Sequence, residues 1–295
     1  MSKIKKFAYY QKKAGVIIRR DGVLALLRKA LLEFMFRLCV NNPVTAITRN
    51  FDFNFQAHQR RIQLSETLYS LTDGIVRYGP LTGFKLRHNS QWGKADRGGM
   101  LLGLYEYEVQ TALLDSSQRR NTFVDLGAAD GFYGVGVVAA RLFKKSYCYE
   151  IDEQARDALI ETAHINGVGD SVVIRRECEA SFYKNIFSDG IAPNDLVVLS
   201  DVEGYEFNIF TADTLAALSK AIIIIEIHDW DGRNHNYEKL RQDAEPHFTI
   251  SEIRTGARDL SHIEELQGFY DSDRWILCSE GRGDFGKWLK LTTKA

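Results

Sequence analysis

A short apolar strand that ends beside an acidic residue and runs into a glycine-spaced turn constrains the fold of this chain more than any other stretch. It spans residues 122–134, TFVDLGAADGFYG, and the turn opens an apolar helix. Glycines let the backbone approach a ligand that a Cβ atom would push away, and the start of a helix presents unpaired N–H groups. The spacing Asp-x-Gly-x-x-x-Gly differs from the dinucleotide fingerprint G-x-G-x-x-G. The stretch therefore predicts a strand, turn and helix that bind a nucleotide-type ligand.

The ligand that best fits this loop is S-adenosylmethionine. It has no pyrophosphate for the helix to hold, and it carries an ammonium that needs a carboxylate such as Asp125 nearby. A second short strand, residues 147–152 (YCYEID), ends in carboxylates, and helical periodicity follows over residues 153–166. Glu150 is therefore placed to accept both ribose hydroxyls. NAD enzymes use the same geometry, so Glu150 predicts a ribose and does not identify the cofactor.

Two further strands also end in titratable residues. Residues 196–206 (LVVLSDVEGYE) form a buried-looking strand followed by an acidic motif. If the strand persists to Glu203, its period of two puts Asp201 and Glu203 on one face, at the edge where open α/β sheets bind ligands. Two close carboxylates raise each other's proton affinity, which suits a general base or a shared cation. Residues 221–228 (AIIIIEIH) predict a central parallel strand.

In order and spacing, these motifs resemble those of the FkbM-type family of S-adenosylmethionine-dependent methyltransferases. The resemblance covers roughly residues 104–279 and rests on the segments 104–108, 125–131, 201–206 and 226–228, with Glu150 and Asn166. The Asp-Val-Glu-Gly-x-Glu and Glu-x-His elements are distinctive of this family, whereas all class I methyltransferases share the glycine loop. Two positions depart from the family's pattern: Leu199 replaces the usual lysine, and Asp130 replaces the usual asparagine.

The resemblance implies an α/β fold of the Rossmann-like class I methyltransferase type. We expect a seven-stranded sheet, mostly parallel with an antiparallel last strand, and an α+β extension at the N-terminus. The activity that it implies is O-methyl transfer from S-adenosyl-L-methionine to a hydroxyl of a sugar in a glycan, a glycolipid or a natural product. A role in polysaccharide biosynthesis would follow from that substrate class.

Site residues follow from the motifs and the resemblance together. We assign Gly127 and Gly131 to the methionine end of the cofactor, Asp125 to the loop geometry and the ammonium, and Glu179 with Ala180 to the adenine edge. The full set of expected cofactor-binding residues is Glu106, Asp125, Gly127, Ala128, Gly131, Glu150, Ile151, Glu179, Ala180 and Asp201. The expected catalytic residues are Asp201, Glu203 and His228, of which Asp201 and His228 position the acceptor and remove its proton.

Three other functions stay open at this stage. Asp201, Glu203 or His228 could hold a divalent cation that orients a diol, which would make the enzyme a metal-assisted O-methyltransferase. The chain could be a non-catalytic adaptor that keeps the fold, although the glycine loop and both acidic motifs are intact. An NAD oxidoreductase is the third alternative. Our first expectation needs no metal.

We expect three regions in the chain: a basic amphipathic helical segment (1–47), a cap (48–103) and a methyltransferase domain (104–295). The net charge is −1, yet the first forty residues contain only Asp21 and Glu33 as acids among many Lys and Arg residues. Residues 23–40 are too charged to span a membrane or to serve as a signal peptide. This segment packs on the domain or on a second copy, or it lies on an anionic membrane surface.

Cysteine spacing and charge indicate where the protein is located and which partners it binds. The four cysteines form no C-x-x-C pair, which indicates reduced thiols in a cytoplasmic protein, with peripheral contact at the inner membrane face left open. The domain as a whole is not basic, so we expect a small-molecule or glycan acceptor and no nucleic acid.

Local patterns predict the remaining elements. In the cap, the alternating phenylalanines 51, 53 and 55 suggest a strand, residues 64–71 a short helix, and residues 75–78 and 83–87 a hairpin around Gly79 and Pro80. A helix is expected over residues 237–244. Residues 248–254 and 274–279 are expected to form the closing strands.

Overall fold

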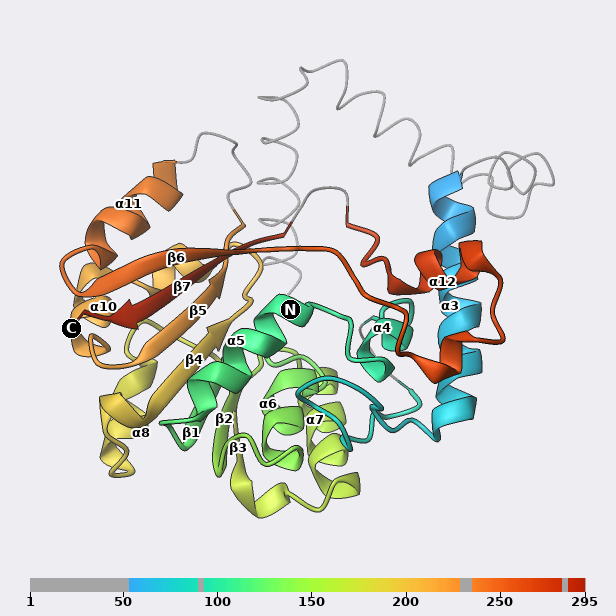
Figure 1. Ribbon diagram of the computed structural model, residues 1–295. Helices are drawn as coiled ribbons and strands as arrows, with labels where there is room; N and C mark the ends of the chain where they lie inside the picture. Colours follow the sequence, from blue (N-terminus) through green and yellow to red (C-terminus); the bar gives the residue numbers. More distant parts are fainter. Residues whose placement is uncertain (1–52, 90–92, 229–234, 283–285, 295) are drawn as a thin grey trace, which may run out of the picture.

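The computed structural model describes residues 53–89, 93–228, 235–282 and 286–294, which form a single seven-stranded sheet covered by helices on both faces (Figure 1). The strand order is β3-β2-β1-β4-β5-β7-β6. Strands β1 to β5 are parallel, and β7 runs antiparallel to both β5 and β6. This confirms the predicted Rossmann-like α/β fold with a seven-stranded sheet, mostly parallel with an antiparallel last strand. The strands are β1 (Thr122–Leu126), β2 (Lys145–Tyr149), β3 (Val172–Arg175), β4 (Leu196–Ser200), β5 (Ile222–Glu226), β6 (Phe248–Arg254) and β7 (Lys287–Thr293).

The two faces of the sheet pack into separate apolar clusters because side chains alternate along each strand. Phe123, Leu199 and Ile224 face one cluster, whereas Val124 and Val198 face the other. The first cluster includes α5 (Tyr107–Ser117), α6 (Phe132–Ala139) and α7 (Glu153–Ile165), and the second includes α8 (Phe182–Ser188), α9 (Glu206–Ile209), α10 (Ala212–Ala217) and α11 (His235–Ala244). Strands covered on both faces read as continuous apolar runs, which is why β4 and β5 were predictable.

Helices α3 (Phe53–Thr72), α4 (Arg97–Leu101) and α12 (Asp271–Cys278) form a lobe beside the sheet (Figure 1). Arg60 of α3 pairs with Asp273 of α12, and Gly98 of α4 donates to Ser65 Oγ at 3.0 Å. Short 3-10 turns at Gly169–Ser171, Pro193–Asp195 and Glu264–Leu266 complete the described elements.

Two predicted strands are helices. The phenylalanine alternation is wrong as a strand signal, because Phe53 and Phe55 lie in α3 and Phe53 is 73% exposed; position 51 is outside the described residues. The buried side chains of α3 recur at helical spacing instead: Arg61, Leu64, Ser65, Leu68 and Thr72. The predicted helix over residues 64–71 is confirmed as part of α3.

The predicted closing strand over residues 274–279 is also wrong, because this run belongs to α12. Asp273 and Leu277 are buried one turn apart, which is a helical pattern. A short apolar run cannot be assigned to strand or helix by periodicity alone. The last strand is β7, whereas β6 matches its predicted range and α11 covers the predicted helix over residues 237–244. The predicted hairpin is reduced to one antiparallel bridge between Ile75 and Lys85.

The predictions for the N-terminal basic segment fall outside the described residues. Within the part of the chain that is described, no helix is both long and apolar enough to cross a membrane. Cys148, Cys178 and Cys278 are free thiols. Cys39, like the N-terminal basic segment, lies outside the described residues.

The ends of β1 and β4 are held together by backbone contact. Asp201 N donates to Leu126 O at 2.9 Å, and Gly127 has a φ of +90°. A Cβ atom on Gly127 would lie 1.9 Å from Asp201 O, which is an impossible approach. Glycine at this position therefore sets the spacing between the first and third acidic motifs.

We expect Gly127→Ala to destabilise the protein more than Gly190→Ala. Both residues have positive φ, but a Cβ atom at Gly190 meets nothing within 4 Å. Each variant should lose about 1–2 kcal/mol to the left-handed backbone, and Gly127→Ala should lose about 1–3 kcal/mol more through overpacking. Urea unfolding of both variants measures the difference. Equal free energies of unfolding would contradict the proposed contact.

Candidate functional site

The acidic motifs converge at one edge of the sheet, as the sequence predicted. The carboxyl ends of β1, β2, β4 and β5 meet there, and β1 lies between β2 and β4. The chain leaves β1 toward β2 and later returns to its other side as β4, so this edge is the topological switch point where open α/β sheets bind ligands.

The glycine loop has few free backbone donors. Gly127 N and Ala128 N both donate to Tyr149 O, at 2.9 and 3.0 Å, and Gly131 N donates to Ala128 O at 2.8 Å. Ala129 N donates to Glu150 Oε2 at 2.8 Å. The expectation of unpaired N–H groups therefore fails at these four positions, because the neighbouring strand end and the turn itself already satisfy them. A ligand therefore finds no free amide donor at these four residues.

Asp125 lies beneath the loop. Its side chain is buried, and burial raises the pKa of its carboxyl to about 7, although the Gly134 N–H bond opposes the shift and the charge of Glu150 adds to it. A Cβ atom on Gly134 would meet Cys148 Sγ at 2.3 Å and Asp125 Oδ2 at 2.9 Å. Asp125 thus connects the end of β1 to the first turn of α6. This agrees with its expected role in the loop geometry, whereas its contact with the ammonium stays a prediction.

Glu150 is held in one orientation at the end of β2. Its Oε2 accepts from Ala129 N and its Oε1 accepts from Asp152 N, each at 2.8 Å. A carboxylate has about four acceptor positions, so both oxygens can still accept hydroxyl protons. Ile151, next in the chain, is 51% exposed and offers an apolar surface beside this carboxylate.

The residues expected at the adenine edge follow β3. Glu179 is exposed, and its carbonyl accepts from Phe182 N at 3.0 Å. Ala180 is half-buried, and its carbonyl accepts from Thr214 Oγ1 at 2.9 Å. Their backbone is thus fixed by α8 and α10, while the contact with adenine stays a prediction.

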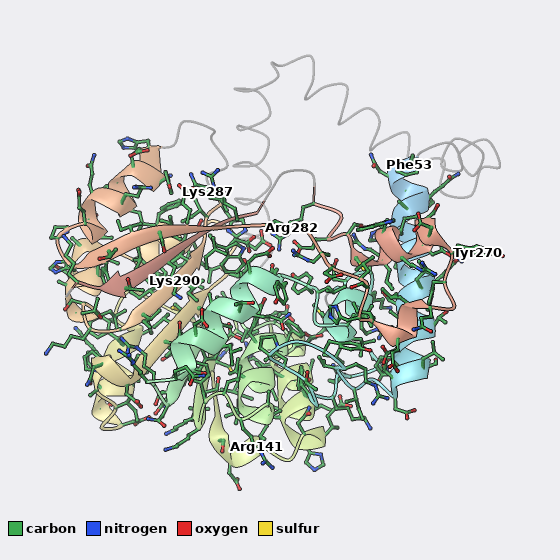
Figure 2. All side chains as sticks on the ribbon, in the orientation of Figure 1. Phe53, Arg141, Tyr270, Arg282, Lys287 and Lys290 are labelled. Atoms are coloured by element: carbon green, nitrogen blue, oxygen red, sulfur yellow. The ribbon has the colours of Figure 1, made fainter. Side chains whose placement is uncertain are left out.

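Glu106 lies in an ion-pair network. It is buried just before α5, where its carboxylate contacts Arg282 and accepts from the Tyr133 hydroxyl at 2.7 Å. Burial raises its pKa to about 7 although the Arg282 charge lowers it. Arg282 also pairs with Glu226 and Glu280, and it lies between the sheet edge and the lobe of α3 and α12 (Figure 2).

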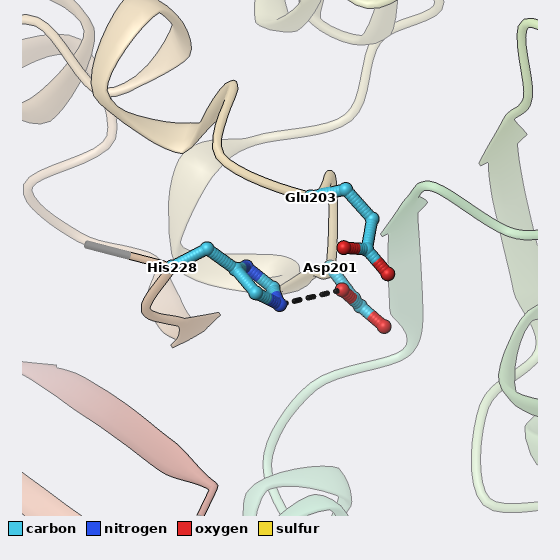
Figure 3. A group of neighbouring side chains, drawn as sticks. All are labelled: Asp201, Glu203 and His228. Atoms are coloured by element: carbon cyan, nitrogen blue, oxygen red, sulfur yellow. Dashed lines mark ion pairs between the residues drawn. The ribbon is translucent and has the colours of Figure 1, made fainter. Parts of the chain in front are cut away.

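Asp201, Glu203 and His228 come together beyond β4 and β5 (Figure 3). Each offers one ligand atom, and these atoms lie within 4.8 Å of one another. The predicted cause of this convergence is wrong: β4 ends at Ser200, and Glu203 and Gly204 have φ angles of +52° and +92°. A left-handed turn therefore brings Glu203 back beside Asp201, and the alternation of an extended strand does not.

Carboxylates surround the His228 ring. Its Nε2 lies 3.7 Å from both Asp201 Oδ1 and Glu226 Oε2, and its Nδ1 lies 3.7 Å from Glu206 Oε1. Burial is the largest effect on the imidazole and lowers its pKa, but the Glu206 hydrogen bond and the nearby carboxylate charges outweigh it, so the pKa is raised. Burial and the charges of Glu226 and Glu106 hold the pKa of Asp201 well above its usual range. Both shifts favour the protonated forms of His228 and Asp201.

Sequence reasoning missed Arg282 and Tyr133 as site residues. Arg282 lies in the glycine-containing segment before β7, where no local pattern marks it, and only the topology brings it to Glu106 and Glu226. Tyr133 lies within the glycine-loop motif, but nothing in the sequence indicates that it contacts Glu106.

Comparisons with known proteins identify no family. No protein-family model matches the chain, and no curated protein matches it either. Similar solved structures include an rRNA methylase from Streptococcus thermophilus, with 11% identity over 65% of this chain and 96% of that chain and a TM-score of 0.45. Another is the precorrin-6y C5,15-methyltransferase of Geobacter metallireducens, with 12% identity, coverage of 63% and 88%, and a TM-score of 0.41.

A third similar structure is Streptococcus pneumoniae Sp1610 in complex with S-adenosyl-L-methionine, with 14% identity, coverage of 62% and 71%, and a TM-score of 0.42. Identities and scores of this size leave the function to be argued from the site.

We expect Glu150→Ala to weaken the binding of S-adenosylhomocysteine by roughly 10–100-fold, because hydrogen bonds to a charged group contribute about 1.5–3 kcal/mol. Isothermal titration calorimetry measures the affinity. Glu153→Ala is the matched control, since it removes an exposed carboxylate three residues away in the first turn of α7. Unchanged affinity in Glu150→Ala, or tight NADH binding by the native chain, would contradict this assignment.

Proposed function

We propose that this protein is an S-adenosylmethionine-dependent O-methyltransferase of the FkbM type that methylates a sugar hydroxyl in a glycan, a glycolipid or a natural product. The observation that carries the proposal is the convergence at one sheet edge of Glu150, the glycine loop and the cluster of Asp201, Glu203 and His228. The first two suit a nucleoside cofactor, and the third suits an acceptor that must lose a proton.

The hydrogen bonding of the loop supports S-adenosylmethionine over a dinucleotide. A pyrophosphate needs several backbone donors, but Gly127, Ala128, Ala129 and Gly131 already donate within the protein. An ammonium needs acceptors instead and does not depend on these amides. In this proposal Glu150 would hold the ribose, and the exposed side chain of Ile151 would offer an apolar contact to the adenine.

The charge around His228 supports a neutral acceptor. Asp201, Glu203, Glu206 and Glu226 surround the ring, and Arg282 neutralises only part of this charge. Polynucleotides bind proteins mainly through contacts between phosphates and basic residues, so such a site repels RNA. It favours a polyhydroxyl compound, whose hydroxyls can donate to carboxylates, and it attracts the positively charged sulfonium.

The chemistry follows from this placement. The acceptor oxygen attacks the methyl carbon of the sulfonium, the C–O bond forms, and the C–S bond breaks with its electrons left on sulfur. Holding the reactants in line accounts for roughly 7–11 kcal/mol of the barrier. The hydroxyl proton must leave, and we assign its removal and the orientation of the oxygen to His228 and Asp201. Glu206 accepts from the His228 backbone N–H and fixes the backbone that carries the ring.

We expect a glycan or glycolipid acceptor to gain one methyl group on oxygen when incubated with the protein and S-adenosylmethionine. Mass spectrometry of a panel of such acceptors, with fragmentation to locate the methyl group, tests this. His228→Ala should lower turnover about 10²–10⁴-fold while S-adenosylhomocysteine affinity is kept.

His164→Ala is the control, since it removes an exposed histidine from the last turn of α7. Methylation of RNA with no methyl gain on any glycan, or full activity of His228→Ala, would refute the proposed acceptor or the proposed role.

A further inference from the structure

The cluster of Asp201, Glu203 and His228 has the composition of a metal site as well as that of a base. It offers one imidazole nitrogen and two carboxylates from two neighbouring strand ends, with ligand atoms no more than 4.8 Å apart. Figure 3 shows the imidazole pointing at Asp201 and the Glu203 carboxylate lying beside them. Cis ligands of a small cation lie about 3 Å apart at metal–ligand distances near 2.1 Å, so small side-chain movements complete such a site.

The orientation of His228 is the second observation. Glu206 has a fully buried side chain, and its Oε1 accepts from His228 N at 2.6 Å and lies 3.7 Å from Nδ1. The Nδ1–Oε1 separation is too long for a hydrogen bond, but the Glu206 carboxylate beside Nδ1 favours a proton on that nitrogen, and Nε2 lies on the side of Asp201. Histidines that ligate metals almost always have such a group beside their second ring nitrogen.

The inner oxygen of Asp201 is the third observation. The Asp201 side chain is 41% exposed, but its Oδ1 atom is buried and accepts no hydrogen bond from the described residues. The 3.7 Å separation from His228 Nε2 is too long for a hydrogen bond. A buried carboxylate oxygen without a donor is costly in its ionised form, and a cation at this position would stabilise that form.

The backbone of Glu203 is strained as well. A non-glycine residue with positive φ costs roughly 1–3 kcal/mol, and such residues gather at ligand sites. Glu203 is exposed and adopts a φ of +52°, which directs its carboxylate toward Asp201.

We infer that Asp201, Glu203 and His228 bind one divalent first-row cation such as Mn²⁺ or Zn²⁺. Two carboxylates neutralise its charge, and the imidazole favours these ions over Mg²⁺ and Ca²⁺, which prefer oxygen ligands throughout. Three protein ligands leave positions open on the solvent side, where two adjacent hydroxyls of a sugar could bind.

One consequence rests on the proposed function. A cation bound here would occupy the Nε2 lone pair, so His228 would then be a ligand and no longer a base. An acceptor hydroxyl bound to that cation would have a lowered pKa and would lose its proton to solvent before its oxygen attacks the methyl carbon. Loss of turnover in His228→Ala is expected in both roles, and cation binding separates them.

Calorimetry with MnCl₂ on the full-length, untagged and EDTA-treated protein tests the inference. We expect one equivalent to bind, and Glu203→Gln and His228→Gln to weaken the affinity by at least about 10-fold, the low end for perturbed metal shells. Asp213→Asn is the matched control, because it removes one exposed carboxylate in the first turn of α10. Titrations with ZnCl₂ and MgCl₂ show which cation binds most tightly.

No saturable Mn²⁺ or Zn²⁺ binding, or equal affinity in native, Glu203→Gln and His228→Gln proteins, would overturn the inference. S-adenosylhomocysteine titrations of the same samples keep the two proposals separate. Cofactor binding without cation binding refutes the metal site alone, and cation binding without cofactor binding refutes the methyltransferase assignment alone. Because Glu203 is exposed, retained cofactor affinity in Glu203→Gln also shows that the variant is folded.

Discussion

The ion pairs of Arg282 make the acidic sheet edge possible. Arg282 contacts Glu106 before α5, Glu226 at the end of β5, and Glu280 in its own segment. Without it, the buried carboxylates of Glu106 and Glu226 would lose their guanidinium partner, a change that costs several kcal/mol or is avoided by protonation. Glu226 in turn lies against His228, so the guanidinium sets both the position and the charge of the group that faces the acceptor. One arginine thus joins the N-terminal side of the domain, the sheet and the C-terminal segment at the candidate site.

The same charge balance limits the chemistry. An excess of carboxylates over cations attracts a sulfonium, a divalent ion or a donor-rich sugar, and it repels phosphate. The glycine loop agrees with this preference, because the amides of Gly127, Ala128, Ala129 and Gly131 are engaged within the protein and offer no donors to a phosphate. The cofactor side and the acceptor side of the site therefore both favour ligands that donate hydrogen bonds or carry positive charge.

Sequence reasoning succeeded where the signal was local and failed where it was not. The loop after β1, Glu150 and the strand ends at Asp201 and His228 were predictable, because apolar runs that end in acids mark the carboxyl edge of a parallel sheet. The helical nature of α12 was not, since a six-residue apolar run fits either period and its burial against α3 depends on tertiary packing. The turn at Glu203 was also hidden, because a positive φ on glutamate has no pattern in sequence. Arg282 reaches its partners only through the return of the chain to β7.

The most direct test of the account is hydrogen-exchange mass spectrometry of the protein with and without S-adenosylhomocysteine. The account predicts slower exchange in the peptides that contain residues 127–133, 150–152 and 201–206, with α3 and α12 unchanged. Protection confined to the lobe of α3 and α12, or no protection at saturating ligand, would contradict the claim that this edge of the sheet holds the cofactor.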